Sequence, residues 1–284
     1  MCRLLKTQVL FGLIAIAASK DLLADRKYCG YQHSDDYYRS NKSISIDEFP
    51  WLAQLIYDEG IIHCTGSLIN NRYILTSAHC LKSARVELKK VRLGDYNVKT
   101  VRDCVPVLDD DEDCSEPYKD FELEGTIVHP AFNPRTGLHD IGLIRLSRTV
   151  IYSDFIRPIC LPRESTVELR NRTSLITSGW GQLGYNEEPT ELKKKVSTEI
   201  ITYEECIKIY GFNKHLLTNE HLCVNETQSI TCHGDDGAPL MRSSHNQWEQ
   251  VGILVTGSRI CNPNFSIFNK VASYVDWIKA MLQP

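Results

Sequence analysis

Three short stretches hold side chains that together could carry out acyl transfer. His79 follows an apolar run, Asp140 precedes another, and the segment CHGDDGAP (232–239) lies near the C-terminus. Covalent hydrolysis of a peptide bond by such a group needs a nucleophilic hydroxyl, an imidazole that takes its proton and a carboxylate that orients the imidazole. His79 could be the imidazole that accepts the proton, and Asp140 the carboxylate that orients it. CHGDDGAP offers two carboxylates and no hydroxyl, as if its reactive atom had been replaced.

Short apolar runs separated by turn residues fill the chain from Phe49 onward. They predict many short strands and favour an all-β sandwich or barrel over an α/β fold. Only the segment SYVDWIKAML (273–282), with apolar residues at helical spacing, predicts a helix. The runs expected as strands are 51–57, 61–69, 73–76, 86–93, 121–128, 141–146, 174–178, 194–201, 239–241 and 251–255.

Further motifs connect these stretches to a known family. Besides TSAHC (76–80), HDIGL (139–143) and CHGDDGAP, the chain carries FPW (49–51), RPICLP (157–162) and SGWG (178–181). All six motifs match that family in sequence and in order. From about Cys29 to the end it resembles the chymotrypsin-like serine peptidases, and among them secreted arthropod serine protease homologues. The resemblance implies two packed six-stranded antiparallel β-barrels with a cleft between them and a C-terminal helix.

The resemblance also identifies what is altered in CHGDDGAP. Where the family has the serine of GDSGGP this chain has Asp236, and Ala238 replaces a glycine. A carboxylate has no hydroxyl proton to lose, and its charge opposes the oxyanion that the amides of Gly234 and Asp236 would stabilise. Loss of the serine costs about 10⁶ in turnover in another protease. The resemblance implies that the triad positions are His79, Asp140 and Asp236, and that the oxyanion loop contains Gly234 and Asp235. We expect His79 and Asp140 to persist as a structural pair, with His79 ion-paired to Asp236.

The maturation switch and the substrate pocket depart from the family as well. Family members are cleaved after a basic residue, and the new aliphatic N-terminus pairs with the carboxylate at Asp235; the corresponding stretch here, YRSN (38–41), lacks both features. Asp235 therefore needs another partner or solvent, because a buried unpaired charge is costly. The oxyanion loop is expected to be zymogen-like. Ile230 stands where trypsin-like members carry an Asp that captures Lys or Arg. The other pocket positions are the substrate-pairing strand Val255, Thr256 and Gly257, and Ser266, which replaces a pocket-wall glycine and narrows the pocket.

Eleven cysteines favour an oxidising compartment. Cys2 lies in the N-terminal segment expected to be removed as a signal peptide, and the other ten can form five disulfides. The resemblance implies the pairs Cys29–Cys160, Cys64–Cys80, Cys206–Cys223 and Cys232–Cys261. The remaining pair, Cys104 and Cys114, lies in a loop where arthropod clotting and melanisation proteases have a bridge.

An N-terminal apolar run, preceded by Arg3 and Lys6, is typical of a secretory signal peptide and is too short to span a bilayer. We expect residues 1–19 to be this signal, 20–48 a short segment tethered by Cys29, and 49–284 the protease-homologue domain, with no clip domain before it. Loss of Arg3 and Lys6 would change the formal net charge from −4 to −6, which does not favour nucleic acid or anionic lipid. Glycosylation sequons, which agree with secretion, occur at Asn41, Asn171, Asn225 and Asn264.

No metal site is predicted. The acidic run Asp109–Asp113 could bind Ca²⁺, but it lacks the spacing of a calcium loop, and a solvated loop is the simpler interpretation. Asp95 and Asp103 fall near a calcium loop of some family members, and the match is loose. His63, His129, His215, His221 and His245 show no metal-ligand spacing.

Three functional hypotheses follow. The leading one is a secreted, monomeric, non-catalytic protease homologue that binds extracellular proteins, such as cascade proteases or zymogens in immunity or melanisation, or that acts in venom, saliva or reproductive fluid. The second is an active endopeptidase with an unconventional nucleophile, such as a water activated by His79 or Asp236. The third is a carbohydrate- or microbe-binding module that reuses the cleft.

Overall fold

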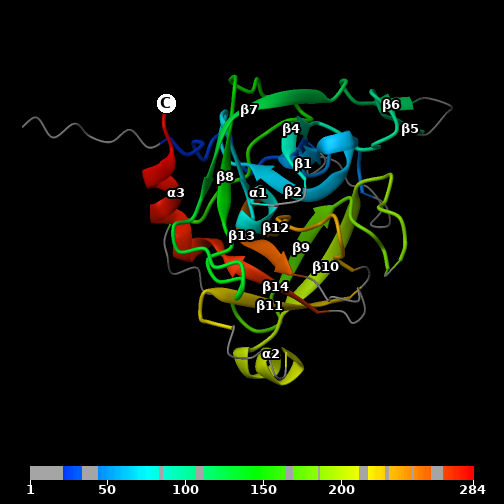
Figure 1. The fold of residues 1–284 in the computed structure, drawn as a ribbon. Coiled ribbons are helices and arrows are strands. Elements are labelled where there is room, and N and C mark those ends of the chain that lie inside the picture. The colour runs from blue at the N-terminus through cyan, green and yellow to red at the C-terminus, as the bar shows by residue number, and fades with distance from the viewer. Residues whose placement is uncertain are drawn as a thin grey trace, which may run out of the picture.

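The computed structural model describes residues 22–33, 44–82, 86–106, 112–163, 169–184, 186–210, 217–227, 230–244, 246–256 and 265–284. Two closed six-stranded antiparallel barrels form the body, one above the other in Figure 1. This architecture confirms the fold predicted from the sequence. A two-stranded hairpin of β5 (Cys104–Pro106) and β6 (Glu112–Cys114) projects from one side in Figure 1.

The first barrel closes because β1 pairs with two neighbours. Ala53 of β1 pairs with Gly66 on one side and with Leu93 on the other, so this sheet has no free edge. The strand order is β1-β2-β3-β8-β7-β4. The strands are β1 (Leu52–Tyr57), β2 (Ile62–Leu68), β3 (Tyr73–Thr76), β4 (Leu88–Leu93), β7 (Lys119–Val128) and β8 (Gly142–Leu146).

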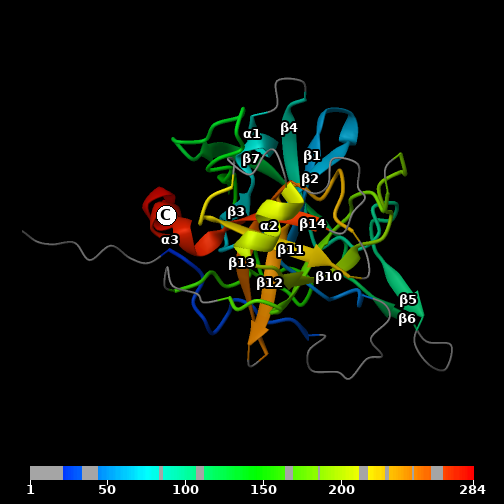
Figure 2. The same ribbon diagram turned by 90° about the horizontal axis from the view of Figure 1, so that it is seen from below.

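The second barrel has the order β10-β11-β14-β13-β12-β9 and is seen from below in Figure 2. Its strands alternate between core and surface: in β10, Lys194, Val196 and Ile200 are buried while Lys195 is exposed. β11 and β14 lie outside the runs predicted as strands. The strands are β9 (Ser174–Gly179), β10 (Lys194–Ile200), β11 (His221–Glu226), β12 (Pro239–Ser244), β13 (Gln247–Thr256) and β14 (Phe265–Lys270).

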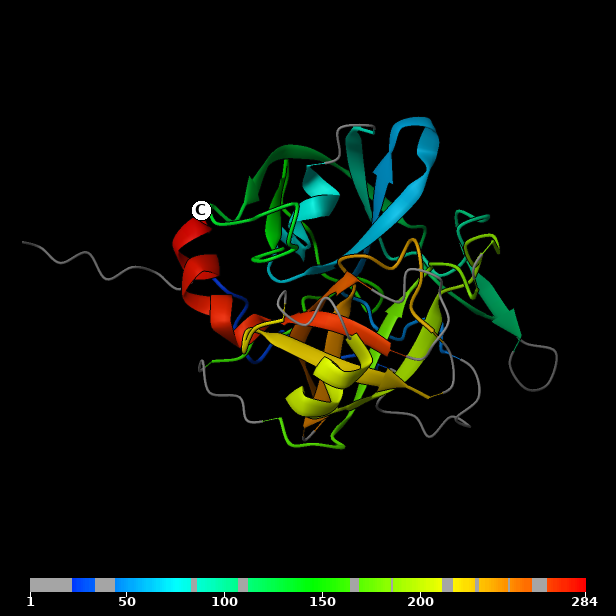
Figure 3. The ribbon, with the colours of Figure 1, turned by 60° about the horizontal axis from the view of Figure 1, so that its bottom comes forward.

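The C-terminal helix predicted from SYVDWIKAML is present. A 3₁₀ turn, η5 (Val271–Tyr274), leads into α3 (Val275–Met281), which lies alongside both barrels in Figure 3. Ile278 is fully buried, and the amide of Gln283 donates to the hydroxyl of Tyr73 over 3.0 Å. The end of the chain is therefore fixed on the first barrel.

Two further helices were not predicted. α1 (Ala78–Leu81) has a single turn, and α2 (Tyr203–Tyr210) lies outside the second barrel. Thr202 and Glu205 form a capping box at the start of α2: the hydroxyl accepts from the amide of Glu205, and the Glu205 carboxylate accepts from the amide of Thr202. A short 3₁₀ turn, η2 (Asp58–Gly60), follows β1. No helix in the described ranges is long and apolar enough to cross a membrane.

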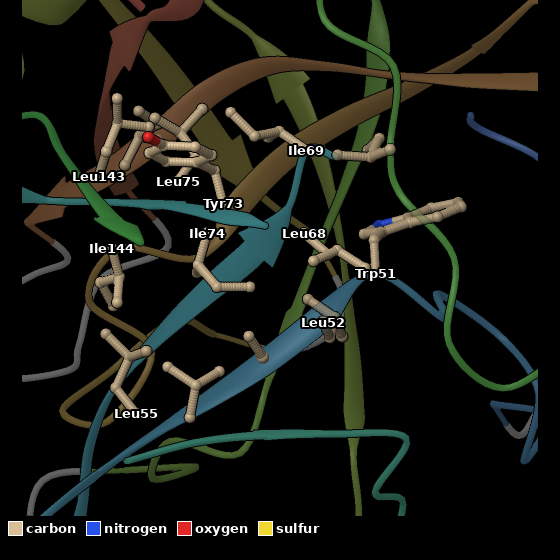
Figure 4. Packing of buried hydrophobic residues seen from close by; sticks show 14 of the residues in the cluster. Trp51, Leu52, Leu55, Leu68, Ile69, Tyr73, Ile74, Leu75, Leu143 and Ile144 are labelled. Atoms are coloured by element: carbon tan, nitrogen blue, oxygen red, sulfur yellow. The ribbon is translucent and has the colours of Figure 1, made fainter. Parts of the chain in front are cut away.

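The core of the first barrel is continuous with the contact between the barrels. Figure 4 shows side chains of β1, β2, β3 and β8 packed together, and the same cluster includes Trp180 and Met241 from the second barrel. The labelled members are Trp51, Leu52, Leu55, Leu68, Ile69, Tyr73, Ile74, Leu75, Leu143 and Ile144. Because the barrels share buried apolar surface, groups contributed by each are held in fixed register.

Disulfides connect the segments as the resemblance implied. The structure contains Cys29–Cys160, Cys64–Cys80, Cys104–Cys114 and Cys206–Cys223. Cys232 is also disulfide-bonded, while its expected partner Cys261 lies outside the described residues.

Leu75→Ala should lower the free energy of unfolding by about 2–5 kcal/mol, because Leu75 is fully buried and its truncation leaves a cavity. Ile151→Ala is the matched control, since the Ile151 side chain is 78% exposed. Its effect should stay within about 0.5 kcal/mol. Urea unfolding of both variants measures the difference, and equal losses would contradict the packing described.

Candidate functional site

His79 and Asp140 meet on the first barrel. His79 lies in α1, directly after β3, and Asp140 precedes β8. Nδ1 of His79 lies 2.6 Å from Oδ2 of Asp140, and the His79 amide donates to Oδ1 over 2.8 Å. The backbone of His139 is left-handed, with φ 54°, at the turn that brings in Asp140, and Asn269 of β14 donates to the Asp140 carbonyl. The carboxylate thus fixes both the backbone and the ring of His79.

Asp236 occupies the other side of the imidazole. Its Oδ1 lies 3.8 Å from Nε2 of His79. The loop that carries it is fastened to β2, because the Thr65 amide donates to the Asp236 carbonyl over 2.8 Å. Gly237 has φ 82°, and a Cβ there would lie 2.2 Å from Oγ1 of Thr76, so a side chain is excluded. A carboxylate therefore faces the imidazole from a rigidly placed loop.

The charges around His79 favour its protonated form. Burial alone lowers the pKa of His79, but the hydrogen bond and charge of Asp140, together with the charge of Asp236, raise it to about 9. Burial raises the pKa of Asp236 to about 6, with His79 opposing the shift and Asp235 adding to it. At neutral pH the site therefore holds an imidazolium between two carboxylates.

Two backbone amides beside Asp236 are available to a ligand. The amides of Gly234 and Asp236 donate to no acceptor within the described residues, and Gly234 has φ 100°, a conformation that suits glycine. An oxyanion hole needs donors that are free to bind developing charge, and these two amides meet that requirement. The Asp236 carboxylate adds a negative charge next to them.

Asp235 is buried and paired. Its carboxylate is 2% exposed and lies 2.7 Å from Nζ of Lys194 on β10. The amides of Gly181 and Cys232 donate to the same carboxylate over 2.8 and 3.0 Å. The expectation that Asp235 finds another partner is met by Lys194, a residue that the motifs did not identify.

Most of the chain matches a known protein family. A family model described as trypsin matches residues 39–278. The chain belongs to the trypsin-like serine protease family.

Several relatives within this family are insect proteins. The chain is 35% identical to "Serine protease 7" of Drosophila melanogaster, covering 93% of this chain and 70% of that one. It is 33% identical to "CLIP domain-containing serine protease HP8" of Bombyx mori (92% and 73% covered) and 32% identical to "Melanization protease 1" of Drosophila melanogaster (88% and 66%). The crystal structure of the Drosophila Grass clip serine protease of the Toll pathway matches with a TM-score of 0.75 at 26% identity, covering 88% of this chain and 73% of that one.

A buried carboxylate that sequence motifs did not identify contacts Ser266, one of the residues predicted to line the primary pocket. Glu226, 2% exposed at the end of β11, accepts hydrogen bonds of 2.6 Å each from the hydroxyls of Thr231 and Ser266. Burial raises its pKa. Ser266 is fully buried and Ile230 is half-buried beside the network. The polar groups at this position are therefore satisfied by one another.

The strand that would pair with substrate is described only in part. Val255 is half-buried near the end of β13, and Thr256 ends that strand. Gly257 lies outside the described residues. The pocket-side strand can therefore be followed as far as Thr256.

A separate cavity of about 460 Å³ opens beside His79. It is lined by Tyr57, His63, Val86, His233 and the Cys64–Cys80 disulfide, with Asp236 at its edge. Apolar walls with a few polar groups are typical of surfaces that accept a ligand or a peptide segment.

Possible metal ligands in the described ranges are engaged elsewhere. The clusters Cys64–His79–Cys80 and Cys104–Glu112–Cys114 contain disulfide-bonded cysteines, which cannot ligate. Asp103 accepts hydrogen bonds from the amides of Tyr96 and Asn97 and from the hydroxyl of Thr100, and Arg92 approaches Asp95. These contacts fit calcium poorly.

Other predicted sites lie on the surface or outside the description. Asn171 and Asn225 are exposed. Asn41, Asn264, His215, His245 and Asp109–Asp111 lie outside the described residues, and occupancy of the sequons stays a prediction.

Asp236→Asn should lower the pKa of His79 below about 9, because it removes a charge that stabilises the imidazolium. The folded pKa of His79 exceeds the unfolded value of about 6.5, so its protonation stabilises the fold below pH 6.5, and this contribution is lost as pH rises through about 9. Asp236 titrates at about 6 and is ionised over most of this window. NMR titration of His79 and urea unfolding from pH 6 to 10 measure both effects; an identical midpoint in the two proteins would show that Asp236 does not act on His79.

Proposed function

We propose that this chain is a secreted, non-catalytic trypsin-like protease homologue that binds other proteins in an extracellular proteolytic cascade. The observation that carries the proposal is the identity of the group facing His79. Nε2 of His79 meets the carboxylate of Asp236 at 3.8 Å, at the place where acyl transfer requires a hydroxyl.

Two chemical obstacles support the loss of catalysis. Attack by the Asp236 carboxylate on a peptide carbonyl would give a mixed anhydride, and the negative charge of this residue opposes the oxyanion beside it. In addition, the hydrogen bond and charge of Asp140, with the charge of Asp236, raise the pKa of His79 to about 9, which favours the protonated imidazole at neutral pH and opposes its action as a general base. Base and nucleophile are both unsuited to acyl transfer.

The pocket supports binding without selection of a basic residue. The carboxylate of Glu226 is occupied by the hydroxyls of Thr231 and Ser266, and Ile230 replaces the Asp expected of trypsin-like members. The cavity beside His79 and the two free amides persist. A segment of a partner protein is therefore the occupant that we propose for the cleft, by analogy with a substrate that is held and not cut.

Disulfides and relatives support the setting. Four described disulfides are typical of proteins that fold in an oxidising compartment. Relatives include proteins named "Melanization protease 1" and "Spaetzle-processing enzyme". These names support the proposal that the chain acts beside such proteases, as a cofactor or a decoy.

Purified protein should not react with an alkyl fluorophosphonate, because this reagent needs a serine hydroxyl activated by a neutral imidazole. Asp236→Ser is the matched control and should be labelled, and His79→Ala introduced into that variant should abolish the labelling. A broad peptide library should remain uncut by the wild-type chain. Wild-type turnover that His79→Ala abolishes would overturn the proposal in favour of an unconventional nucleophile.

Capture from body fluid identifies what the cleft binds. Immobilised wild-type protein should retain a protease or a protease precursor. His233→Glu, which places a carboxylate at the cavity wall, should weaken that capture, because we propose that the partner segment lies in this cavity. Retention of cell-wall polysaccharide would instead favour a carbohydrate-binding module.

A further inference from the structure

We infer that Lys194 is a positioning residue that replaces the N-terminal ammonium group of a cleaved family member, so that the oxyanion loop reaches its mature arrangement in the uncleaved chain. The inference rests on the buried Lys194–Asp235 pair and does not depend on whether the site is catalytically inactive.

The ammonium group of Lys194 is fully coordinated. It lies 2.7 Å from Oδ2 of Asp235 and donates to the carbonyls of Gln182 and Ile230 over 2.7 and 3.1 Å. An ammonium has three N–H donors, so each has an acceptor. Its side chain is 8% exposed, and that of Asp235 is 2% exposed. This is a complete site for one cation, occupied by the chain itself.

The ammonium connects three segments that surround the candidate site. Gln182 follows the SGWG motif, Ile230 lies in the pocket loop, and Asp235 is in the oxyanion loop. The Gln182 amide also donates to the carbonyl of His233 over 3.0 Å. Removal of the ammonium would leave two carbonyls and a carboxylate without their donor in a place with little access to water, and such groups are costly to bury unpaired.

Glycines next to Asp235 show how closely the carboxylate is enclosed. A Cβ at Gly179 would lie 2.4 Å from Oδ1 of Asp235, and a Cβ at Gly181 would lie 2.4 Å from Oδ2. A side chain at either glycine would therefore collide with the carboxylate, which Lys194 already pairs.

The geometry of the oxyanion loop agrees with this role. In the uncleaved chain the Gly234 and Asp236 amides are free of acceptors within the described residues, and the Asp235 carboxylate holds the amides of Gly181 and Cys232. On this inference the loop is mature, in place of the zymogen-like loop expected from the missing N-terminal switch. A lysine on a barrel strand provides the cation permanently, because it belongs to the fold and not to a cleaved terminus.

Hydrogen exchange read by mass spectrometry tests the inference on the full chain. Lys194→Met should speed exchange of the Gly181 and Cys232 amides by about tenfold or more, because local opening no longer breaks an ion pair. Lys195→Met is the matched control: Lys195 neighbours Lys194 on β10, is 38% exposed and pairs with Glu48. It should leave these two amides at the wild-type rate. Exchange in Lys194→Met that equals the wild-type rate would overturn the inference.

Two further arms keep the test decisive. Trypsin nicking of the wild-type chain after Arg39 or Lys42 should leave exchange of the loop unchanged, and slower exchange after nicking would show that a new N-terminus orders it. If Lys194→Met is too unstable to study, the double variant Lys194→Met/Asp235→Asn should melt at a higher temperature than Lys194→Met, since it removes the uncompensated carboxylate. A double variant that melts no higher would contradict the pairing.

Discussion

A carboxylate buried where the two barrels meet requires a cation at the same place, and the arrangement of the site depends on how this requirement is met. Asp235 receives the Lys194 ammonium together with two backbone amides, so its charge is compensated without solvent. SGWG has glycine at positions 179 and 181 because a side chain there would collide with this carboxylate. Once Asp235 is fixed, the next residue along the chain has little freedom, and Asp236 is presented to the imidazole.

At His79, nearby carboxylates stabilise a positive charge and so change the protonation of the imidazole. An imidazole flanked by one carboxylate and one hydroxyl can pass a proton back and forth, whereas an imidazole between Asp140 and Asp236 retains it. The carboxylate of Asp140 contributes most to the raised pKa of His79, and the charge of Asp236 adds to it. Under the proposed function, the exchanged side chain at Asp236 would therefore both replace the nucleophile and favour the protonated base.

Sequence reasoning was strongest where a pattern repeats or a motif is long. Short apolar runs predicted an all-β fold and the C-terminal helix. The family resemblance carried by the ordered motifs implied the two barrels and the positions of His79, Asp140 and Asp236. Lys194 and Glu226 were missed because charged residues are ordinarily placed on the surface. Strand alternation was an available signal for both, since Lys194 shares a face with Val196, and Glu226 shares one with Val224. Their partners come from distant segments, and no local spacing predicts such contacts. The capping box of α2, in contrast, is a local sequence pattern that could have been recognised and was overlooked.

Placement of a structural cation on a barrel strand also bears on timing. A protein that waits for a cut to complete its binding surface has two populations, and its response is set by the protease that makes the cut. A protein whose Lys194 is in place as soon as β9 and β10 pair has one population from the moment it folds. Under the proposed function, its influence on a cascade would follow from the amount synthesised and the rate of its removal, and control would lie with gene expression and clearance.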